Sequence, residues 1–415
     1  MPDEDLGAFR ARARQWIAAN LEPLDGADSF MGHASDDAEQ VVRAKAIQRN
    51  LWDGGFAGLC YPARYGGQGL PPEYQQAFNS ESRGYELPTL FTTPTLTIIL
   101  PTILDFGTEE QKQRYIPAAL RGEELWVQFL SEPTGGSDLA GALTRATRDG
   151  DVYLLSGSKI WSSYAWKSDY AVCVCRTDWD APKHRGLSVL IVKIHQPGIQ
   201  IGQIKHVDGT EEFCQEFFDD VPIPADQMLG RVNDGWAVAS RLLFHERAAV
   251  GGASPYEVGP RLSERRGGRA DVAAVAELAG RGEDPHVRQL LGEARMLSRV
   301  HRALVRRIGT SIQTGRLPPP AGSLPRLSNG LLGVRMAVIA LEIGGDRTVA
   351  WDEGDPVGEL GIAYLGRQGS CLGGGTTEIA RNIISERVLG MPRERALDLG
   401  LPFREVRMNA MPSRR

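Results

Sequence analysis

Hydrophobic and polar residues follow different periods in successive parts of the 415-residue chain. In the first part, apolar residues recur every three to four positions over residues 9–21 and 41–52, which predicts two amphipathic helices. The middle part carries short β-rich runs broken by Gly, Asp and Pro, at residues 152–155, 170–175, 187–192 and 216–218. The helical period then returns at residues 237–250, 287–308 and 331–343. We therefore expect helices, then an antiparallel sheet or small barrel, then helices again.

This order predicts an α+β multidomain fold, because the chain is too long for one ordinary core. We place an N-terminal helical domain at residues 1–122, a middle antiparallel β-barrel-like domain at 123–232, a C-terminal helical domain at 233–395 and a tail at 396–415. The tail has a mixed pattern, and we expect only part of it to be ordered. Residues 259–282 are rich in Arg, Gly and Ala without interleaved aromatic residues, which predicts a mobile solvated loop rather than an RNA-binding box.

Charge and hydropathy exclude several classes of partner. The formal net charge is −5, which argues against nucleic acid as the main partner. The most apolar early stretch, residues 95–104, is too short to cross a bilayer, and we expect no membrane span. The acidic N-terminus has none of the features of a secretory signal.

The cysteines indicate reduced thiols and a cytoplasmic location. Their number is odd and they are widely scattered, at Cys60, Cys173, Cys175, Cys214 and Cys371. Cys173 and Cys175 would face the same side of a strand, but no further ligands follow at the spacing that a metal needs. We expect buried structural thiols there and no metal site.

The common signatures of nucleotide-binding and hydrolytic sites are absent. The chain has no Gly-Lys dipeptide and hence no Walker loop, and residues 67–69 lack the third glycine of a dinucleotide fingerprint. It has neither a nucleophile elbow nor a zinc-binding His-Glu-x-x-His helix. The chemistry must therefore depend on other motifs.

Two glycine loops and a tryptophan are the remaining candidates. Residues 131–138, Ser-Glu-Pro-Thr-Gly-Gly-Ser-Asp, combine hydroxyls with two glycines that let the backbone approach a ligand, although a tight turn has the same composition. Residues 373–378, Gly-Gly-Gly-Thr-Thr-Glu, lead into a helical run, which suits a diphosphate or simply a helix capped by Thr376 or Thr377. Trp161 lies beside Ser162 and Ser163, where it can pack on an aromatic cofactor or belong to the core.

Taken together and in this order, the three motifs resemble those of the acyl-CoA dehydrogenase family. The resemblance covers nearly the whole chain and includes residues 107–112, 157–161, 217–222, 235–236 and 381–382. It implies an FAD flavoprotein with a helical N-terminal domain, a β-barrel-like middle domain and a C-terminal four-helix bundle. It also implies oxidation of an acyl-CoA thioester to the trans-2-enoyl thioester, with electron-transfer flavoprotein as the acceptor.

The resemblance assigns eight residues to the FAD site: Leu130, Ser131, Gly136, Ser137, Trp161, Ser163, Thr376 and Glu378. Of these, Leu130 and Ser131 would contact the flavin ring and Trp161 would lie against it, with Ser163 near its reactive edge. Ser137 would contact phosphate or substrate, and the last two residues would hold the adenosine half. Arg247 is expected beside the substrate, where it orients its helix or Glu246.

The base that removes the substrate's α-proton needs a separate assignment. Many family members carry it as a Glu directly before the last Gly-Thr, a position that Gly374 occupies here. Glu246 lies where isovaleryl and long-chain members carry an alternative Glu, so it is the predicted base, with hydride passing to flavin N5. Gly374 would donate its N–H to the thioester oxygen and leave room for branched or bulky acyl groups. The competing interpretation of residues 245–247 is a surface charge cluster.

Several alternatives stay open. The family's usual Arg-x-x-Phe-Gly segment is not recognisable, so a homo-oligomer (dimer or tetramer) and a heterotetramer with a second subunit are both compatible with the sequence. The same fold could also act on an acyl carrier protein thioester in natural-product biosynthesis, or serve as a flavin oxidase or monooxygenase. A third alternative is a non-catalytic partner subunit of a heteromeric dehydrogenase.

Overall fold

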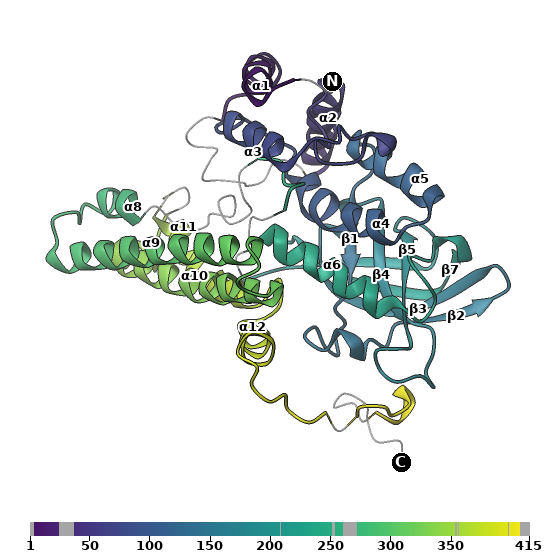
Figure 1. Cartoon of the computed structure of the whole chain (residues 1–415). Coiled ribbons are helices and arrows are strands. Elements are labelled where there is room, and N and C mark those ends of the chain that lie inside the picture. The colour runs from purple at the N-terminus through teal and green to yellow at the C-terminus, as the bar shows by residue number, and fades with distance from the viewer. Residues whose placement is uncertain are drawn as a thin grey trace.

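The computed structural model describes residues 4–24, 37–207, 209–250, 254–259, 272–352, 355, 357–396 and 398–406. Its N-terminal helices stack on a curled sheet, and the long C-terminal helices project to one side of that sheet (Figure 1). This arrangement confirms the predicted helix–sheet–helix architecture.

The N-terminal region is helical, as its apolar period predicts. Its elements are α1 (Leu6–Asn20), α2 (Asp37–Asp53), α3 (Pro72–Glu81), the π-helical η2 (Phe91–Ile99), α4 (Leu100–Phe106) and α5 (Glu109–Leu120). In α1, Phe9, Ala13 and Ile17 are buried at the predicted helical spacing. Gln111 of α5 donates to the carbonyl oxygens of Asp226 and Met228, which fastens this region to the end of the sheet domain.

The sheet contains three strands that the sequence pattern did not reveal. Its strands are β1 (Trp126–Phe129), β2 (Arg145–Asp149), β3 (Val152–Ser163), β4 (Tyr170–Arg176), β5 (Leu187–Lys193), β6 (Ile199–Ile204) and β7 (Phe213–Pro224). The order is β1-β4-β2-β3-β7-β6, with β5 paired to β4. β1 and β2 were missed because β1 is only four residues long and β2 is nearly all exposed and polar. β6 was missed although its isoleucines alternate with Gln and Gly, because none of its residues is fully buried.

The pairing is antiparallel except where β4 meets β1 and β2. β1 pairs with β4 in parallel because a long connection, not a hairpin, separates them. The expectation of a wholly antiparallel sheet was therefore wrong at this edge. β3 and β7 pair along nearly their full length, with register shifts at Leu155/Gly157 and Ile160/Ser162.

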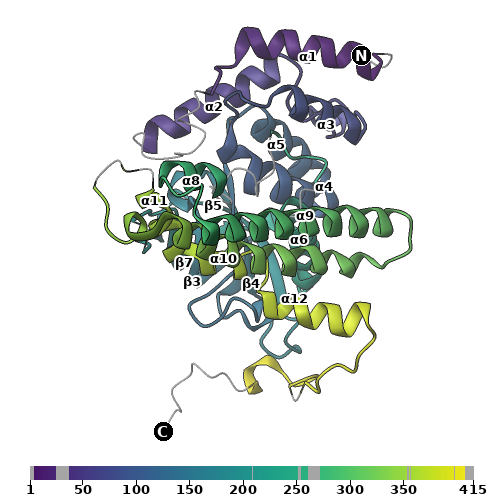
Figure 2. The same cartoon turned by 90° about the vertical axis from the view of Figure 1, so that its left-hand side faces the viewer.

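The C-terminal region is built around a pair of long helices. Its elements are α6 (Gly235–Val250), α8 (Val272–Leu278), α9 (Pro285–Gln313), α10 (Ser323–Gly344), α11 (Gly358–Gly366) and α12 (Thr377–Ile383). α9 and α10 lie side by side, with α12 below them (Figure 2). The predicted solvated loop was wrong for α8, because Val272, Val275 and Ala276 pack in the bundle core. Residues 260–271 of that loop lie outside the described residues.

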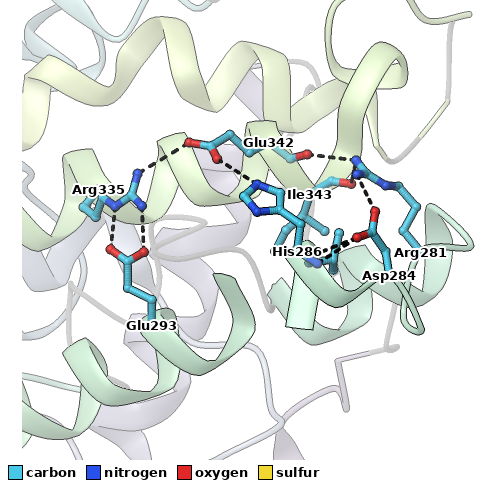
Figure 3. Close-up of polar contacts among 8 residues, drawn as sticks. Arg281, Asp284, His286, Glu293, Arg335, Glu342 and Ile343 are labelled. Carbon is cyan, nitrogen blue, oxygen red and sulfur yellow. Dashed lines mark hydrogen bonds and ion pairs between the residues drawn. The ribbon is translucent and has the colours of Figure 1, made fainter. Parts of the chain in front are cut away.

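Ion pairs reinforce the packing of α9 on α10. Arg335 of α10 makes two hydrogen bonds of 2.7 Å to the carboxylate of Glu293 of α9 (Figure 3). Near the end of α10, Arg281 donates to the carbonyl oxygens of Glu342 and Ile343 and thereby satisfies groups that a helix end leaves free. The first interaction joins α9 to α10, and the second joins the turn before α9 to the end of α10.

One helix within the described residues, at 319–348, is long and apolar enough by length and composition to cross a membrane. Its central part is α10, whose Leu332, Ile339 and Ile343 are buried in the bundle core. The core helix of a bundle has the same length and composition, so the finding is weak support for a span.

Part of the C-terminal tail packs against the rest of the chain. Residues 398–406 lie against the sheet domain, and Phe403 is fully buried there. Residues 407–415 lie outside the described part, so how much of the tail is ordered stays a prediction.

Gly235 at the start of α6 should tolerate no side chain. A Cβ there would lie 2.5 Å from Cα of Ser188 in β5, so the helix must move away from the strand if Gly235 is replaced. We expect Gly235→Ala to cost about 1–3 kcal/mol in the free energy of unfolding, measured by urea denaturation. Gly292→Ala in α9 is the matched control, because no atom lies within 4 Å of its added Cβ. Equal stability of the two variants would contradict this account of α6.

Candidate active site between the sheet and the C-terminal helices

A buried ion pair holds the first glycine loop. Nζ of Lys159 in β3 lies 2.8 Å from a carboxylate oxygen of Glu132, and the two side chains are 0% and 4% exposed. The same Nζ donates to the carbonyl oxygen of Leu130 at 3.0 Å. Because Leu130 and Glu132 flank Ser131, the cation fixes the backbone on both sides of that residue.

The carboxylate of Glu132 also holds the far end of the loop. It accepts hydrogen bonds from the backbone N–H groups of Leu143 at 2.6 Å and Thr144 at 2.8 Å. Burial alone raises the pKa of this carboxyl, but Lys159 and the hydrogen bonds outweigh it, so the pKa lies below its usual value. Glu132 therefore stays ionised and closes residues 131–144, hereafter the cofactor loop, into a fixed shape.

The predicted ligands in the cofactor loop are accessible. Leu130 and Ser131 are half-buried, whereas Gly136 and Ser137 are exposed. The N–H of Ile160 donates to the carbonyl oxygen of Ser131 at 2.9 Å, which brings the loop against β3 next to Trp161. The first glycine motif and the tryptophan thus form one surface.

Trp161 offers an uncovered aromatic face on that surface. Its side chain is 55% exposed, and its φ of 68° lies in the left-handed region, at the β3–β7 register shift. Backbone strain of this kind is uncommon outside functional sites. Ser163 lies two residues on and is half-buried. A flat ring stacked on the indole and hydrogen-bonded by nearby hydroxyls fits this surface, so the residues present are compatible with an isoalloxazine.

Glu216 lies behind this surface and was not predicted. It is fully buried on β7, where Oγ of Ser162 donates to one carboxylate oxygen at 3.1 Å and the other oxygen has no partner. Burial raises the pKa of Glu216 to about 7. The only signal in the sequence is its place between Cys214 and Phe218 in the inward-facing alternation of β7.

Helix α6 is anchored so that Glu246 faces the sheet domain. Asp105 of α4 accepts hydrogen bonds from Arg241 at 2.6 Å and from His245 at 2.9 Å. The side chain of His245 is only 11% exposed. The interpretation of residues 245–247 as a surface charge cluster therefore fails for His245, which orients the helix.

Glu246 itself is partly accessible and lies where α6, β1 and α10 meet. Burial raises the pKa of its carboxyl. Arg247, a hydrogen bond from the side chain of Gln128 and the charge of Arg326 oppose this effect without cancelling it. Of these neighbours, sequence reasoning identified only Arg247.

Arg326 connects Glu246 to the second glycine loop. It is a nearly buried residue of α10 that donates to the carbonyl oxygens of Ser370 at 3.0 Å and Gly373 at 2.7 Å, while its Nε has no partner. Its charge also acts on Glu246. A charged residue among the mostly apolar positions of α10 was the only sequence feature that pointed to this role.

The second glycine loop has the conformation that its composition predicts. Gly374 and Gly375 have φ values of 72° and 85°, which residues with side chains rarely adopt. Thr376 caps α12 by accepting from the N–H of Ile379 at 3.1 Å, which confirms the capping interpretation. Glu378 is exposed, and its contact with adenosine stays a prediction.

A groove of about 470 Å³ lies beside this loop, between α10 and α12. Leu331, Val338, Leu372, Glu378 and Arg381 contribute to its lining. It combines apolar walls with charged groups at the position where the resemblance puts the adenosine half of FAD.

Arg247 stands apart from these contacts. Burial lowers its pKa, the nearby charge of Arg387 acts in the same direction, and Glu246 opposes them. No contact identifies a substrate group for it, so its role stays a prediction.

The cysteines contribute no metal site within the described residues, where no three His, Cys, Asp or Glu side chains gather. All five are free thiols. Cys173 and Cys175 are buried in the core of the sheet domain, as expected of structural thiols.

Comparison with known proteins identifies relatives along most of the chain. The N-terminal, middle and C-terminal domain families of acyl-CoA dehydrogenase match residues 3–123, 128–221 and 233–389. The chain is 33% identical to acyl-CoA dehydrogenase IpdE1 of Mycobacterium tuberculosis, over 94% of this chain and 99% of that relative. A solved structure described as "Tcur3481-Tcur3483 steroid ACAD" is 27% identical, with a TM-score of 0.75 over 94% of this chain and 99% of that chain.

Loss of the buried cation should destabilise the cofactor loop. Lys159→Met leaves Glu132 charged and unpaired in the interior, so we expect a loss of about 3–5 kcal/mol in the free energy of unfolding, measured by urea denaturation. The control is Lys45→Met, which removes a half-exposed ion pair with Asp169 and should cost at most about 1 kcal/mol. Similar losses for both variants would show that the buried pair has no special role.

Proposed function

Because the chain belongs to the acyl-CoA dehydrogenase family, we propose that Glu246 of this FAD-dependent oxidoreductase removes the α-proton of an acyl-CoA thioester. The observation that carries the proposal is the link through Arg326, which binds the Gly373 carbonyl and acts electrostatically on Glu246. Gly374 carries no carboxylate. Glu246 is the carboxyl group that Arg326 connects to the loop that contains Gly374.

FAD, when bound, supplies the two-electron acceptor for the β-hydride, so that a trans-2-enoyl thioester results. Leu130, Ser131, Trp161 and Ser163 would hold its ring. Gly136 and Ser137 would lie at its phosphates, and Thr376 and Glu378 at its adenosine. The exposed indole face of Trp161 and the accessible hydroxyls beside it support this assignment.

The division of tasks between Glu246 and Gly374 follows from the acidity of the α-proton. That proton is weakly acidic until the thioester carbonyl is polarised, and the N–H of Gly374 would donate to the carbonyl oxygen. Burial keeps the pKa of Glu246 above that of an ordinary Glu, which makes its carboxylate a stronger base. The side chain of Gln128 favours the charged form.

The absence of a side chain at Gly374 supports a branched or bulky acyl group. The solved structure at 27% identity is described as a steroid acyl-CoA dehydrogenase, which supports ring-containing thioesters as substrates. We further propose electron-transfer flavoprotein as the acceptor and the cytoplasm as the location.

Exposed apolar side chains on the long helices support an oligomer. Met296 and Val300 of α9 are 50% and 58% exposed, and Leu331 of α10 is 47% exposed. Several exposed apolar residues on neighbouring helices are typical of a surface that another subunit covers. A second copy and a different subunit both fit this surface, and the mass of the native assembly would distinguish them.

Glu246→Gln should abolish substrate oxidation without loss of FAD. The amide cannot accept the α-proton, so we expect the rate of flavin bleaching on anaerobic mixing with branched and steroid-like acyl-CoA thioesters to fall about 10²- to 10⁴-fold. Glu277→Gln, at an exposed position of α8, is the control and should react at the wild-type rate. Bleaching at the normal rate in Glu246→Gln would remove this residue from the mechanism.

Gln128→Leu should shift the pH dependence of the reaction. A base acts when deprotonated, so kcat/KM falls as the pH drops through the pKa of Glu246, already above its ordinary value. Losing the hydrogen bond raises that pKa further, and the acid limb should move to higher pH. Stability should be retained, because Oε1 of Gln128 is a buried acceptor without a partner.

The surface variant Gln196→Leu is the control, since its amide bonds only to the carbonyl of Lys193 in an exposed turn. An acid limb at the same pH in Gln128→Leu and Gln196→Leu would contradict the contact between Gln128 and the base.

A further inference from the structure

The end of the chain returns to the sheet domain and inserts an aromatic side chain. The chain leaves α12 and runs beneath the sheet (Figure 1). Phe403 is 1% exposed, and its ring lies 3.3 Å from the guanidinium carbon of Arg176 and 5.5 Å from the ring of Trp179. This is a packed contact between segments more than 200 residues apart in the sequence.

Backbone hydrogen bonds and ion pairs surround the inserted ring. The N–H groups of Phe403 and Arg404 donate to the carbonyl oxygens of Ala181 and Trp179, each at 3.0 Å. The side chain of Arg404 also forms an ion pair with Asp180. The segment 398–406, hereafter the strap, is therefore held along its length.

Arg176, beneath Phe403, is bonded to the cofactor loop. It is fully buried at the end of β4, and its guanidinium donates to the carbonyl oxygens of Ala140 at 2.6 Å, Ala142 at 3.1 Å and Lys183 at 3.2 Å. Its backbone N–H donates to the carbonyl oxygen of Thr144 at 2.7 Å. One side chain thus fastens the loop segment that directly follows Ser137.

The charge of Arg176 has no carboxylate in direct contact among the described residues. Burial lowers its pKa to about 10, while Glu132 and Asp138 oppose this from a longer distance. A buried cation bonded only to carbonyl oxygens is costly, and an aromatic face stabilises it most when water is excluded. Phe403 provides that face and covers the cation.

A second contact joins the strap to the cofactor loop directly. Nζ of Lys183 lies 2.6 Å from a carboxylate oxygen of Asp138 in the loop and 3.4 Å from one of Asp398 in the strap. The side chain of Lys183 is only 15% exposed. The loop is therefore connected to the strap by a packed contact and by an ionic bridge.

We propose that the strap fixes the cofactor loop, with Phe403 as a positioning residue that acts through Arg176 on the backbone around Ser137. The consequence for FAD rests on the proposed function, in which that loop contacts the cofactor. Because the strap follows α12, one stretch of chain joins the second glycine loop to the first. Without Phe403, water reaches Arg176, its bonds to Ala140 and Ala142 loosen, and FAD is released faster.

The test compares Phe403→Ala with Leu399→Ala, which truncates an 81% exposed side chain of the same strap. Amide hydrogen exchange of residues 138–144 and the rate of FAD release from the holoenzyme, followed by free-flavin fluorescence, are measured for both variants. We expect Phe403→Ala to raise exchange in this segment and to speed FAD release about tenfold, equivalent to about 1.4 kcal/mol. Leu399→Ala should match the wild type in both measurements.

Lys183→Met serves as a second variant that leaves the packed core intact, and it should raise exchange in the same segment. Exchange and FAD release at wild-type values in both Phe403→Ala and Lys183→Met would overturn the proposal. Raised exchange with unchanged FAD release would support the strap and instead overturn the role of the cofactor loop in binding FAD.

Discussion

The buried ion pair between Lys159 and Glu132 is the interaction on which the candidate site depends. It joins β3 to the cofactor loop and bonds to three backbone groups, at Leu130, Leu143 and Thr144. These contacts give an irregular loop of Gly, Pro and Ser a single shape. The predicted flavin contacts at Ser131 and Trp161 are adjacent because this pair holds the loop against β3.

Buried side-chain cations also bond to loop carbonyl oxygens at two further places, one in the same cofactor loop and one in the second glycine loop. Arg176 bonds to the carbonyl oxygens that follow Ser137, and Arg326 bonds to those that precede Gly374. Buried carbonyl groups need donors, and glycine-rich loops cannot satisfy one another as strands do. A buried cation with several donors meets this need and sets the local electrostatics. In the case of Arg326, the same cation acts on Glu246, so the loop and the electrostatic environment of Glu246 are coupled.

Much of the fold was predictable because side chains that are buried at regular intervals appear as apolar residues at the same intervals in the sequence. Helices such as α1 and α9, and the apolar strands β4 and β5, were found in this way. β2 was not, because it is nearly all exposed and polar, and the docking of Phe403 depends on a distant partner that local pattern cannot reveal. At the candidate site, motifs led to the prediction of Trp161 and Glu246. They could not identify Gln128, Arg326 or Glu216, since each gains its role only from residues far away in the sequence.

We propose that Glu246, and no other group, takes the α-proton. Exchange of the α-proton in D₂O, with FAD-loaded enzyme and a panel of acyl-CoA thioesters whose β-carbon carries no hydrogen, isolates this step because hydride transfer cannot follow. We predict that the wild type catalyses this exchange and that Glu246→Gln, with the same FAD content, does not. Exchange at the wild-type rate in Glu246→Gln would contradict the assignment.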